Sequence, residues 1–155
     1  MLGHYFLIGV ADAGNAVLET QENNKKSRKF QVTLPDLSVS ALKTPASAAK
    51  GSSIVVQDTT SNKAPVPAGA STTRFYLSTD ALFDPGDVPL DPLVLGRAVP
   101  ALAAKGKSAG STSVTIPLAT APGVYFVLAV ADGDGAVSEV NEANNSRSRK
   151  ITITP

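Results

Sequence analysis

The chain contains two copies of one segment, and this internal repeat constrains the fold more than any other feature. Residues 3–33 align with residues 123–154 after one deletion opposite Ala143, and 16 of the 31 aligned pairs are identical. A repeat of this quality indicates that one structural unit occurs more than once. Because 155 residues have room for one domain of common size plus a fragment, we expect one complete module and part of a second.

Composition favours an all-β fold. The chain is rich in Ser, Thr, Val and Ala, and its 12 Gly and 11 Pro residues interrupt it too often for long helices. The formal net charge is only +1, so no nucleic-acid partner is expected. Cysteine is absent, which excludes disulfides and thiolate chemistry and leaves the redox compartment open. The apolar run Leu2–Ala11 lacks a basic flank and is too short to span a bilayer. We interpret it as a strand and expect no signal peptide or membrane span in this segment.

From Leu34 onward, short strand-like segments alternate with Pro and Gly turns. Val114 and Ile116 alternate with Ser113 and Thr115, the period of two that a sheet packed on one face requires. Seven such strands over about 120 residues fit an immunoglobulin-like β-sandwich, with a jelly roll or small barrel as the alternative. The strands are expected at residues 36–43, 51–60, 72–78, 93–99, 111–118, 123–131 and 147–154.

Three segments between these strands have the composition of exposed connections. Residues 46–50 and 101–110 are small and polar, and residues 62–69 contain two prolines. We expect all three to lie on the surface without forming a site.

The N-terminal copy is interpreted as two strands, at residues 3–11 and 28–33, joined by a turn-rich loop. A lone pair of strands is marginally stable in water, so this hairpin-like element needs partners. Burying its apolar side chains at ~25 cal/mol per Å² would be worth several kcal/mol. We therefore interpret residues 1–33 as the C-terminal strands of a preceding, incomplete repeat and residues 34–155 as the complete domain. The candidate interface residues are Tyr5, Phe6, Ile8, Val10, Phe30 and Val32.

Three partners fit this element: strands upstream of the segment, the neighbouring domain of the same chain, or another copy of the chain through strand addition. A head-to-tail contact of the third kind would generate a filament. Both copies begin their last strand with a basic run, at residues 25–29 and 147–150. We expect these charged side chains to face solvent and to oppose edge-to-edge pairing.

Four acidic residues on one loop are candidate calcium ligands: Asp80, Asp84, Asp87 and Asp91. Carboxylate oxygens suit Ca²⁺, although the spacing does not match an EF-hand loop. The alternative is a set of solvated acids that begin β-turns beside Pro85.

A second acidic run, at residues 132–135, also has the composition of a calcium loop. The equivalent residues 12–15 lack the second carboxylate. Because the two copies disagree at this position, a turn is the better interpretation.

Catalytic residues are not indicated. His4 is the only histidine, Val124 occupies its position in the other copy, and there is no cysteine. Neither a Ser-His-Asp triad nor a metal cluster is therefore expected. The chain has 5 Phe and 3 Tyr residues and no Trp, which argues against a sugar-binding platform. We predict that the protein is not an enzyme and that it needs no cofactor.

Two tyrosines occupy equivalent positions in the repeat. Tyr125 follows Pro122-Gly123 and resembles the tyrosine that pins a corner of immunoglobulin-like sandwiches through its hydroxyl. Tyr5 is its counterpart. The alternative is a tyrosine that contacts a ligand.

The loop before the last strand carries four further candidate residues. Asn144 and Asn145 tolerate positive φ and suit a tight reversal into that strand. Glu139 and Glu142 are expected to accept backbone amides across the loop. We interpret the loop as structural, with ligand binding as the alternative.

Several motifs, in this order, resemble the CARDB domain, the bacterial cell-adhesion-related module. They are Pro35-Asp36-Leu37, FYLSTD at residues 75–80, PGVY at residues 122–125, and VSEVNE with the following Asn144-Asn145 at residues 137–145. The resemblance covers residues 34–155, and the N-terminal copy matches only the last two strands of that family.

The resemblance implies an immunoglobulin-like sandwich of the kind usually found in tandem in large surface or secreted proteins. The implied function is a non-catalytic extracellular adhesion or structural module, one unit of a tandem array at a bacterial-type cell surface. Its partners would be neighbouring repeats or other copies of the chain, and no surface ligand is specified. The alternatives are a self-assembling filament, in which the N-terminal strands complete a neighbouring subunit, and a calcium-dependent ligand-binding module.

Overall fold

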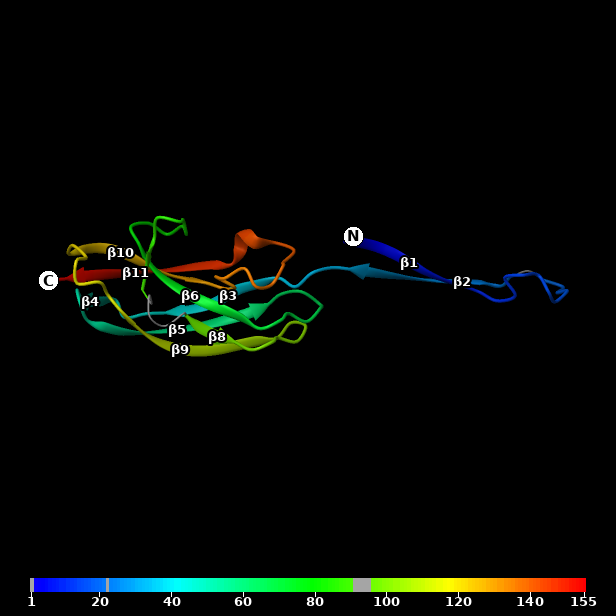
Figure 1. Ribbon diagram of the computed structural model, residues 1–155, viewed down its shortest axis with the longest axis horizontal. Coiled ribbons are helices and arrows are strands. Elements are labelled where there is room, and N and C mark those ends of the chain that lie inside the picture. Colours follow the sequence, from blue (N-terminus) through cyan, green and yellow to red (C-terminus); the bar gives the residue numbers. More distant parts are fainter. Residues whose placement is uncertain (1, 22, 91–95) are drawn as a thin grey trace. The chain divides into compact units, whose positions relative to one another are not determined.

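The computed structural model describes residues 2–21, 23–90 and 96–155. The chain divides into two compact units, residues 1–33 and residues 34–155. The first unit is a two-stranded sheet, and the second contains the two main sheets of a β-sandwich (Figure 1).

The first unit is an antiparallel hairpin of β1 (Gly3–Val10) and β2 (Lys25–Val32), in which Gly3 pairs with Val32 and Val10 with Lys25. Successive side chains of a strand point to opposite faces. The apolar side chains that the sequence grouped together therefore divide between two faces, with Tyr5, Leu7, Phe30 and Val32 on one and Phe6, Ile8 and Val10 on the other.

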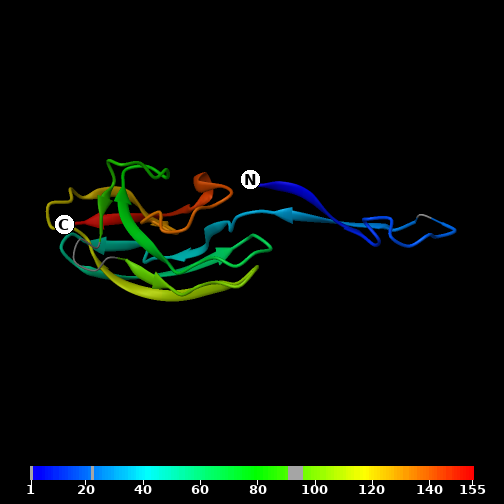
Figure 2. The ribbon, with the colours of Figure 1, turned by 45° about the vertical axis from the view of Figure 1, so that its right-hand side comes forward.

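One sheet of the second unit contains three antiparallel strands in the order β3-β5-β9. These strands are β3 (Leu37–Lys43), β5 (Ser53–Asn62) and β9 (Lys107–Thr115). Figure 2 shows β5 and β9 as the lower layer of the sandwich, with β10 and β11 above them.

The other sheet follows the order β4-β11-β10-β6-β7, with β8 also paired to β6. β4 runs parallel to β11, and the other pairs are antiparallel. A short 3-10 helix, η1 (Glu142–Asn144), lies between β10 and β11. The strand bounds are β4 (Ser47–Ala49), β6 (Ser71–Ser78), β7 (Val88–Pro89), β8 (Arg97–Val99), β10 (Gly123–Val130) and β11 (Ser146–Thr154).

The hydrophobic core lies between the two sheets. Buried and exposed side chains alternate along the first part of β5 and the end of β11, as the period of two in the sequence predicted. In β10, by contrast, four consecutive residues, 127–130, are buried. The expected all-β sandwich is confirmed. The core includes Ile54, Val56, Phe75, Leu77, Val114, Ile116, Val127, Ile151 and Ile153.

The prediction of three exposed connections holds only in part. Most residues of 46–50 and 101–110 are exposed, but both segments contain strand residues. β4 lies within residues 46–50, and β9 begins at Lys107, inside residues 101–110. Within residues 62–69, Asn62, Ala64 and Ala68 are buried. These segments are small or polar, so apolar alternation did not reveal their backbone pairing.

Other strand boundaries also differ from the prediction. β7 was not expected, and β9 ends at Thr115 rather than at residue 118. Of the strand expected at residues 93–99, the described part forms β8 from Arg97 to Val99, while residues 93–95 lie outside the described residues.

A buried ion pair joins the two sheets. The Arg97 Nε atom in β8 donates to Asp58 Oδ1 in β5 at 2.7 Å, and Arg97 Nη2 contacts Asp58 Oδ2. Arg97 Nη1 also donates to Ser108 Oγ at 3.2 Å. A Cβ atom added at Gly110 would lie 2.5 Å from Arg97 Cδ, so Gly110 leaves the space that the arginine occupies. The sequence did not predict this pair.

Candidate functional site

The sequence repeat is also a structural repeat. Gly3 and Val32 pair in the hairpin as their counterparts Gly123 and Ile153 pair in the domain. Val10 and Lys25 at the other end of the hairpin likewise match Val130 and Ser146. The two strand pairs thus have one register, and we call β1–β2 the uncovered copy and β10–β11 the covered copy.

The loops that follow the first strand of each copy share one conformation. Asp12 has φ 44° and Asp132 has φ 47°. The Asp12 carboxylate accepts from the amides of the residues four and five positions later, at 2.8 and 3.0 Å. Asp132 does the same at 3.1 and 2.8 Å. The shared aspartate therefore holds the turn by accepting two backbone N–H groups, as a local carboxylate can.

The two copies differ in what packs against them. In the domain, β6 pairs with one edge of the covered copy and β4 with the other. Val127 is 0% exposed there, whereas its counterpart Leu7 in the uncovered copy is 69% exposed. Among the described residues, β1 and β2 pair only with each other. Within the described residues, neither edge of the hairpin pairs with a further strand, and nearly all its strand side chains are exposed.

The loop at residues 138–145, here called the clamp loop, holds the start of the domain. The buried Glu139 carboxylate accepts from the backbone N–H of Leu37, at the beginning of β3, and from Asn145 Nδ2 at 3.0 Å. Asn144 Nδ2 donates to Asp36 Oδ1 at 2.9 Å. The Val140 N–H donates to the carbonyl of Pro35 at 2.9 Å. The motif residues Pro35-Asp36-Leu37 are thus the partners of the clamp loop.

Burial raises the pKa of Glu139 to about 7, against hydrogen bonds from Leu37 and Asn145 that lower it. Glu142 accepts from the Glu139 N–H at 3.0 Å. The two glutamates therefore differ in role. Glu142 accepts a hydrogen bond within its own loop, whereas Glu139 accepts one from β3, a strand distant in sequence. In the uncovered copy the counterpart of Glu139 is Glu19, whose side chain is exposed.

The acidic loop uses its carboxylates within its own turns. Asp80 Oδ1 accepts from the Leu82 N–H at 2.8 Å. Asp84 Oδ1 accepts from the Gly86 N–H at 2.6 Å, and Asp87 Oδ2 from the Asp84 N–H at 3.0 Å. Asp91 lies outside the described residues. Within the described ranges, no three His, Cys, Asp or Glu side chains come together as a metal site.

The second acidic run also has structural partners. Asp134 forms an ion pair with Arg74 in β6, and a Cβ atom added at Gly133 would lie 2.8 Å from Arg74 Cγ. Asp134 therefore joins its loop to the neighbouring strand. Gly14 stands at its position in the uncovered copy, where no described strand supplies an arginine.

Tyr125 lies partly buried against the core. In the part of the chain that the structure describes, its hydroxyl forms no hydrogen bond, so the corner bond expected from the sequence is not found. Tyr125 instead lines a cavity of about 360 Å³ together with Leu77, Val88 and Pro117.

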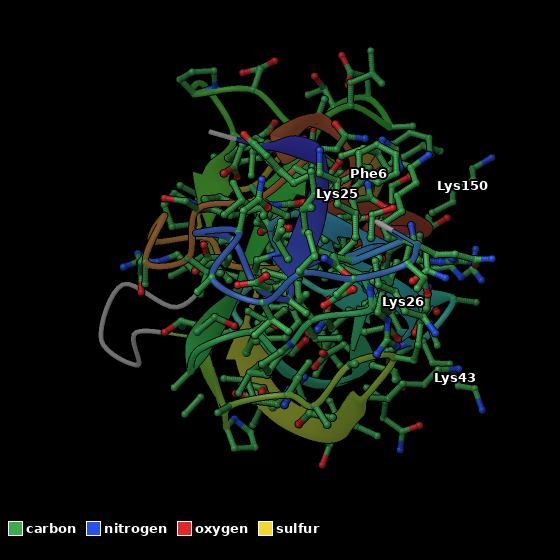
Figure 3. The ribbon with its side chains drawn as sticks, turned by 90° about the vertical axis from the view of Figure 1, so that its right-hand side faces the viewer. Phe6, Lys25, Lys26, Lys43 and Lys150 are labelled. Carbon is green, nitrogen blue, oxygen red and sulfur yellow. The ribbon has the colours of Figure 1, made fainter. Side chains whose placement is uncertain are left out.

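The basic run of the covered copy does not face solvent throughout. Lys150 points away from the sandwich, as does Lys43 (Figure 3). Arg149 Nε, however, donates to the carbonyl of Leu42 in β3 at 2.9 Å, and Arg147 is half-buried. Arg149 thus connects β11 to β3 of the other sheet, which the sequence did not predict.

Asn62 is a further structural residue that the sequence did not single out. Its Nδ2 atom donates to the carbonyl of Val66 at 2.7 Å, and its Oδ1 atom accepts from the N–H groups of Ala64 at 3.0 Å and Asp36 at 3.2 Å. Its place at the end of an alternating strand, before two prolines, was the only signal in the sequence.

The fold and the clamp loop define an immunoglobulin-like module whose first strand is held by its own closing loop. The CARDB family model matches residues 34–149, and the chain belongs to the CARDB family. The hairpin lies outside the matched residues. No curated protein matches the chain in sequence.

Solved structures share the fold at low sequence identity. The crystal structure of a CARDB domain from Pyrococcus furiosus, in complex with di-metal ions, has a TM-score of 0.56 and 19% identity, covering 78% of this chain and 90% of that chain. Its solution structure has the same score and identity, covering 79% and 98%. A domain from Methanosarcina acetivorans, named for a cell surface protein, has a TM-score of 0.49 and 18% identity, covering 78% and 93%.

None of the described residues forms a helix long and apolar enough to cross a membrane.

Proposed function

We propose that the chain is a non-catalytic extracellular adhesion or structural module, with residues 34–155 as one unit of a tandem immunoglobulin-like array. The uncovered copy carries this proposal. β1 and β2 reproduce β10 and β11 in register and in loop hydrogen bonds. The segment before Leu34 therefore has the geometry of the closing strands of another unit. Membership of the CARDB family supports a structural or adhesive role.

The pairing of β4 with β11 supports a load-bearing role for the domain. The Thr152 N–H donates to the Ala46 carbonyl at 2.9 Å, and the Lys50 N–H donates to the Thr154 carbonyl at 3.1 Å. The two strands are parallel, so tension on the two ends of the domain pulls them in opposite directions along their length. Their hydrogen bonds are then loaded together rather than one at a time.

Single-molecule pulling on residues 34–155 tests this role. Ala48→Pro removes a backbone N–H from the middle of β4, and we expect the unfolding force to fall well below that of the parent domain. Ala48→Gly keeps the N–H and serves as the matched control. Equal unfolding forces for the parent and Ala48→Pro would refute a load-bearing β4–β11 pair.

A self-assembling filament is the second candidate, and the exposed apolar faces of the hairpin favour it. Leu7, Ile8 and Phe6 are among the most exposed apolar side chains of the described residues, and a neighbouring subunit would bury them. Light scattering and negative-stain images test this function, because a filament requires particles that grow with concentration. Deleting residues 1–33 would abolish assembly and leave a folded domain, whereas a monodisperse monomer of the intact chain excludes the filament.

Neither the structural module nor the filament requires bound calcium. Three of the four candidate aspartates already accept backbone amides within their own loop. An unchanged thermal transition in EGTA is therefore expected.

A further inference from the structure

The edge of β1 that faces away from β2 is the most distinctive unpartnered surface of the hairpin. In the covered copy, the matching edge of β10 pairs with β6 from Phe126↔Ser78 to Val130↔Arg74. Within the described residues, nothing pairs with this edge of β1. An exposed strand edge is a template for a further strand.

Charge distinguishes the two free edges of the hairpin. β1 contains no Lys, Arg, Asp or Glu residue, whereas β2 contains Lys25, Lys26, Arg28 and Lys29. Figure 3 labels Lys25 and Lys26 on the hairpin together with Phe6 of β1. Lysine on an edge strand opposes pairing with a similar strand. The edge of β1 is therefore the one open to an apolar partner.

We propose that this edge binds an extended antiparallel strand of the β6 kind, supplied by a partial immunoglobulin-like unit that lacks its two closing strands. The proposal rests on the proposed function, because it treats the hairpin as the closing strands of such a unit. The hydrogen bonds of the edge provide affinity, and the side chains opposite Leu7 and Gly9 provide specificity.

The covered copy specifies which side chains the bound strand presents. Leu77 pairs with Val127, and Phe75 pairs with Ala129, and all four are buried. The counterparts of Val127 and Ala129 in the hairpin are Leu7 and Gly9. The nearest described atom to a Cβ built at Gly9 is the Lys26 carbonyl oxygen at 4.0 Å. A glycine at this position leaves room for an aromatic side chain, such as that of Phe75, on the opposite strand.

Glu19 supplies a second point of attachment. Its counterpart Glu139 accepts the backbone N–H of Leu37 at the start of β3. Glu19 is exposed and has the same place relative to its loop aspartate. It is therefore positioned to accept the corresponding N–H from the first strand of the bound unit.

A second intact copy of the chain does not fit the site. In each intact copy, β6 is already paired with β10 on one side and with β7 and β8 on the other. A second copy could offer only a strand that lies at a sheet edge, such as β1, which would give a symmetric β1–β1 contact. The experiment below distinguishes that contact from the proposed one.

Register-specific disulfide exchange tests the proposal in the full chain, which has no native cysteine. Leu128 pairs with Tyr76, so Ile8 should face the Tyr76 position of a bound strand. The probe is a synthetic peptide with the sequence of residues 71–78 carrying Tyr76→Cys, activated as a mixed disulfide with thionitrobenzoate. Release of thionitrobenzoate by the Ile8→Cys chain measures capture.

We expect the Ile8→Cys chain to capture the peptide at least about tenfold faster than the Phe6→Cys chain, whose register partner is Ser78. A peptide that also carries Phe75→Pro should lose this advantage, because proline disrupts strand pairing. Equal rates for the two chains would overturn the proposal. So would captured peptide that is displaced by a second Ile8→Cys chain to leave chain dimers as the main product, because that product indicates β1–β1 pairing. The pulling experiment on residues 34–155 does not involve the hairpin, so failure here is distinguishable from failure of the proposed function.

Discussion

The covered and uncovered copies have the same register and the same loop hydrogen bonds, but they lie in different surroundings. Ile151 is 0% exposed, whereas its counterpart Phe30 is 47% exposed. The strand register and the loop hydrogen bonds therefore need only the repeated residues, such as the aspartate that accepts two N–H groups in each loop. Burial depends instead on β6, β4 and β3, which only the covered copy has.

One position where the copies differ follows the same division. Asp134 is replaced by Gly14, and the partner of Asp134 is Arg74 in β6. The loop aspartates Asp12 and Asp132 are retained, and their partners lie in their own loops. Contact with another strand does not by itself decide which residues are shared, because Glu139, which accepts from the N–H of Leu37 in β3, is retained as Glu19.

The largest expected effect on stability comes from removing the ion pair between Asp58 and Arg97, which joins the two sheets of the domain. Asp58→Ala leaves Arg97 buried without its partner, and we expect the free energy of unfolding of the domain to fall by about 3–5 kcal/mol. Urea denaturation followed by circular dichroism measures this change. The double variant with Arg97→Ala should lose much less than the sum of the single losses, and simple additivity would contradict the pairing.

A matched pair of core and hairpin variants tests the comparison directly. Ile151→Ala removes a fully buried side chain and should cost the domain about 3 kcal/mol. Phe30→Ala, at the equivalent position of the hairpin, should change the stability of the domain by less than about 0.5 kcal/mol. Similar losses from the two variants in urea denaturation would show that the hairpin is also covered.

The clamp loop predicts a pH dependence of the stability of the domain. Glu139 has an ordinary pKa of 4.5 and a folded-state pKa of about 7. Between these values only the folded state retains the proton. The free energy of unfolding should therefore be highest near pH 4.5, fall by about 1–3 kcal/mol as the pH rises to 7, and then level off.

Glu139→Gln is the control for this dependence, because it cannot ionise. Chemical denaturation at several pH values should give a flatter profile for this variant than for the parent. A parent profile that rises between pH 4.5 and 7, or a variant with an unchanged slope, would be inconsistent with a buried Glu139.

The smallest effect is expected at the shared loop aspartates. Asp132→Ala deprives two backbone N–H groups of their acceptor and should lower the stability of the domain by about 1–2 kcal/mol. Asp12→Ala makes the same change in the hairpin and should leave the thermal transition of the domain unaltered. A comparable shift of the thermal transition in both variants would contradict the claim that the hairpin does not contribute to the stability of the domain.

Much of the fold follows from the sequence because its signals are local. Val114, Ile116, Ile151 and Ile153 alternate with polar residues, and all four lie in the core. The start of β9 was missed because Lys107–Gly110 has no apolar period and pairs with the polar end of β5. Backbone hydrogen bonds form there without a hydrophobic pattern.

The site residues depend on long-range contacts that one sequence does not specify. Glu139 and Leu37 are 102 residues apart, so the loop motif predicted an acceptor but not its partner. The buried ion pair does have a signal in the sequence. Asp58 continues the inward positions of Ile54 and Val56 along β5, and an acid at such a position needs a buried cation. Its identity as Arg97 could come only from the fold.

Amide hydrogen exchange on the intact chain tests most directly whether the hairpin is an uncovered copy of β10–β11. The amides of β10 that bond to β6 should exchange at least about a hundredfold more slowly than the corresponding outward amides of β1. The outward amides of β1 should exchange at nearly the rate of an open chain, since no described strand pairs with them. Equal protection of the two sets would contradict the account, because it would mean that the edge of β1 is already covered.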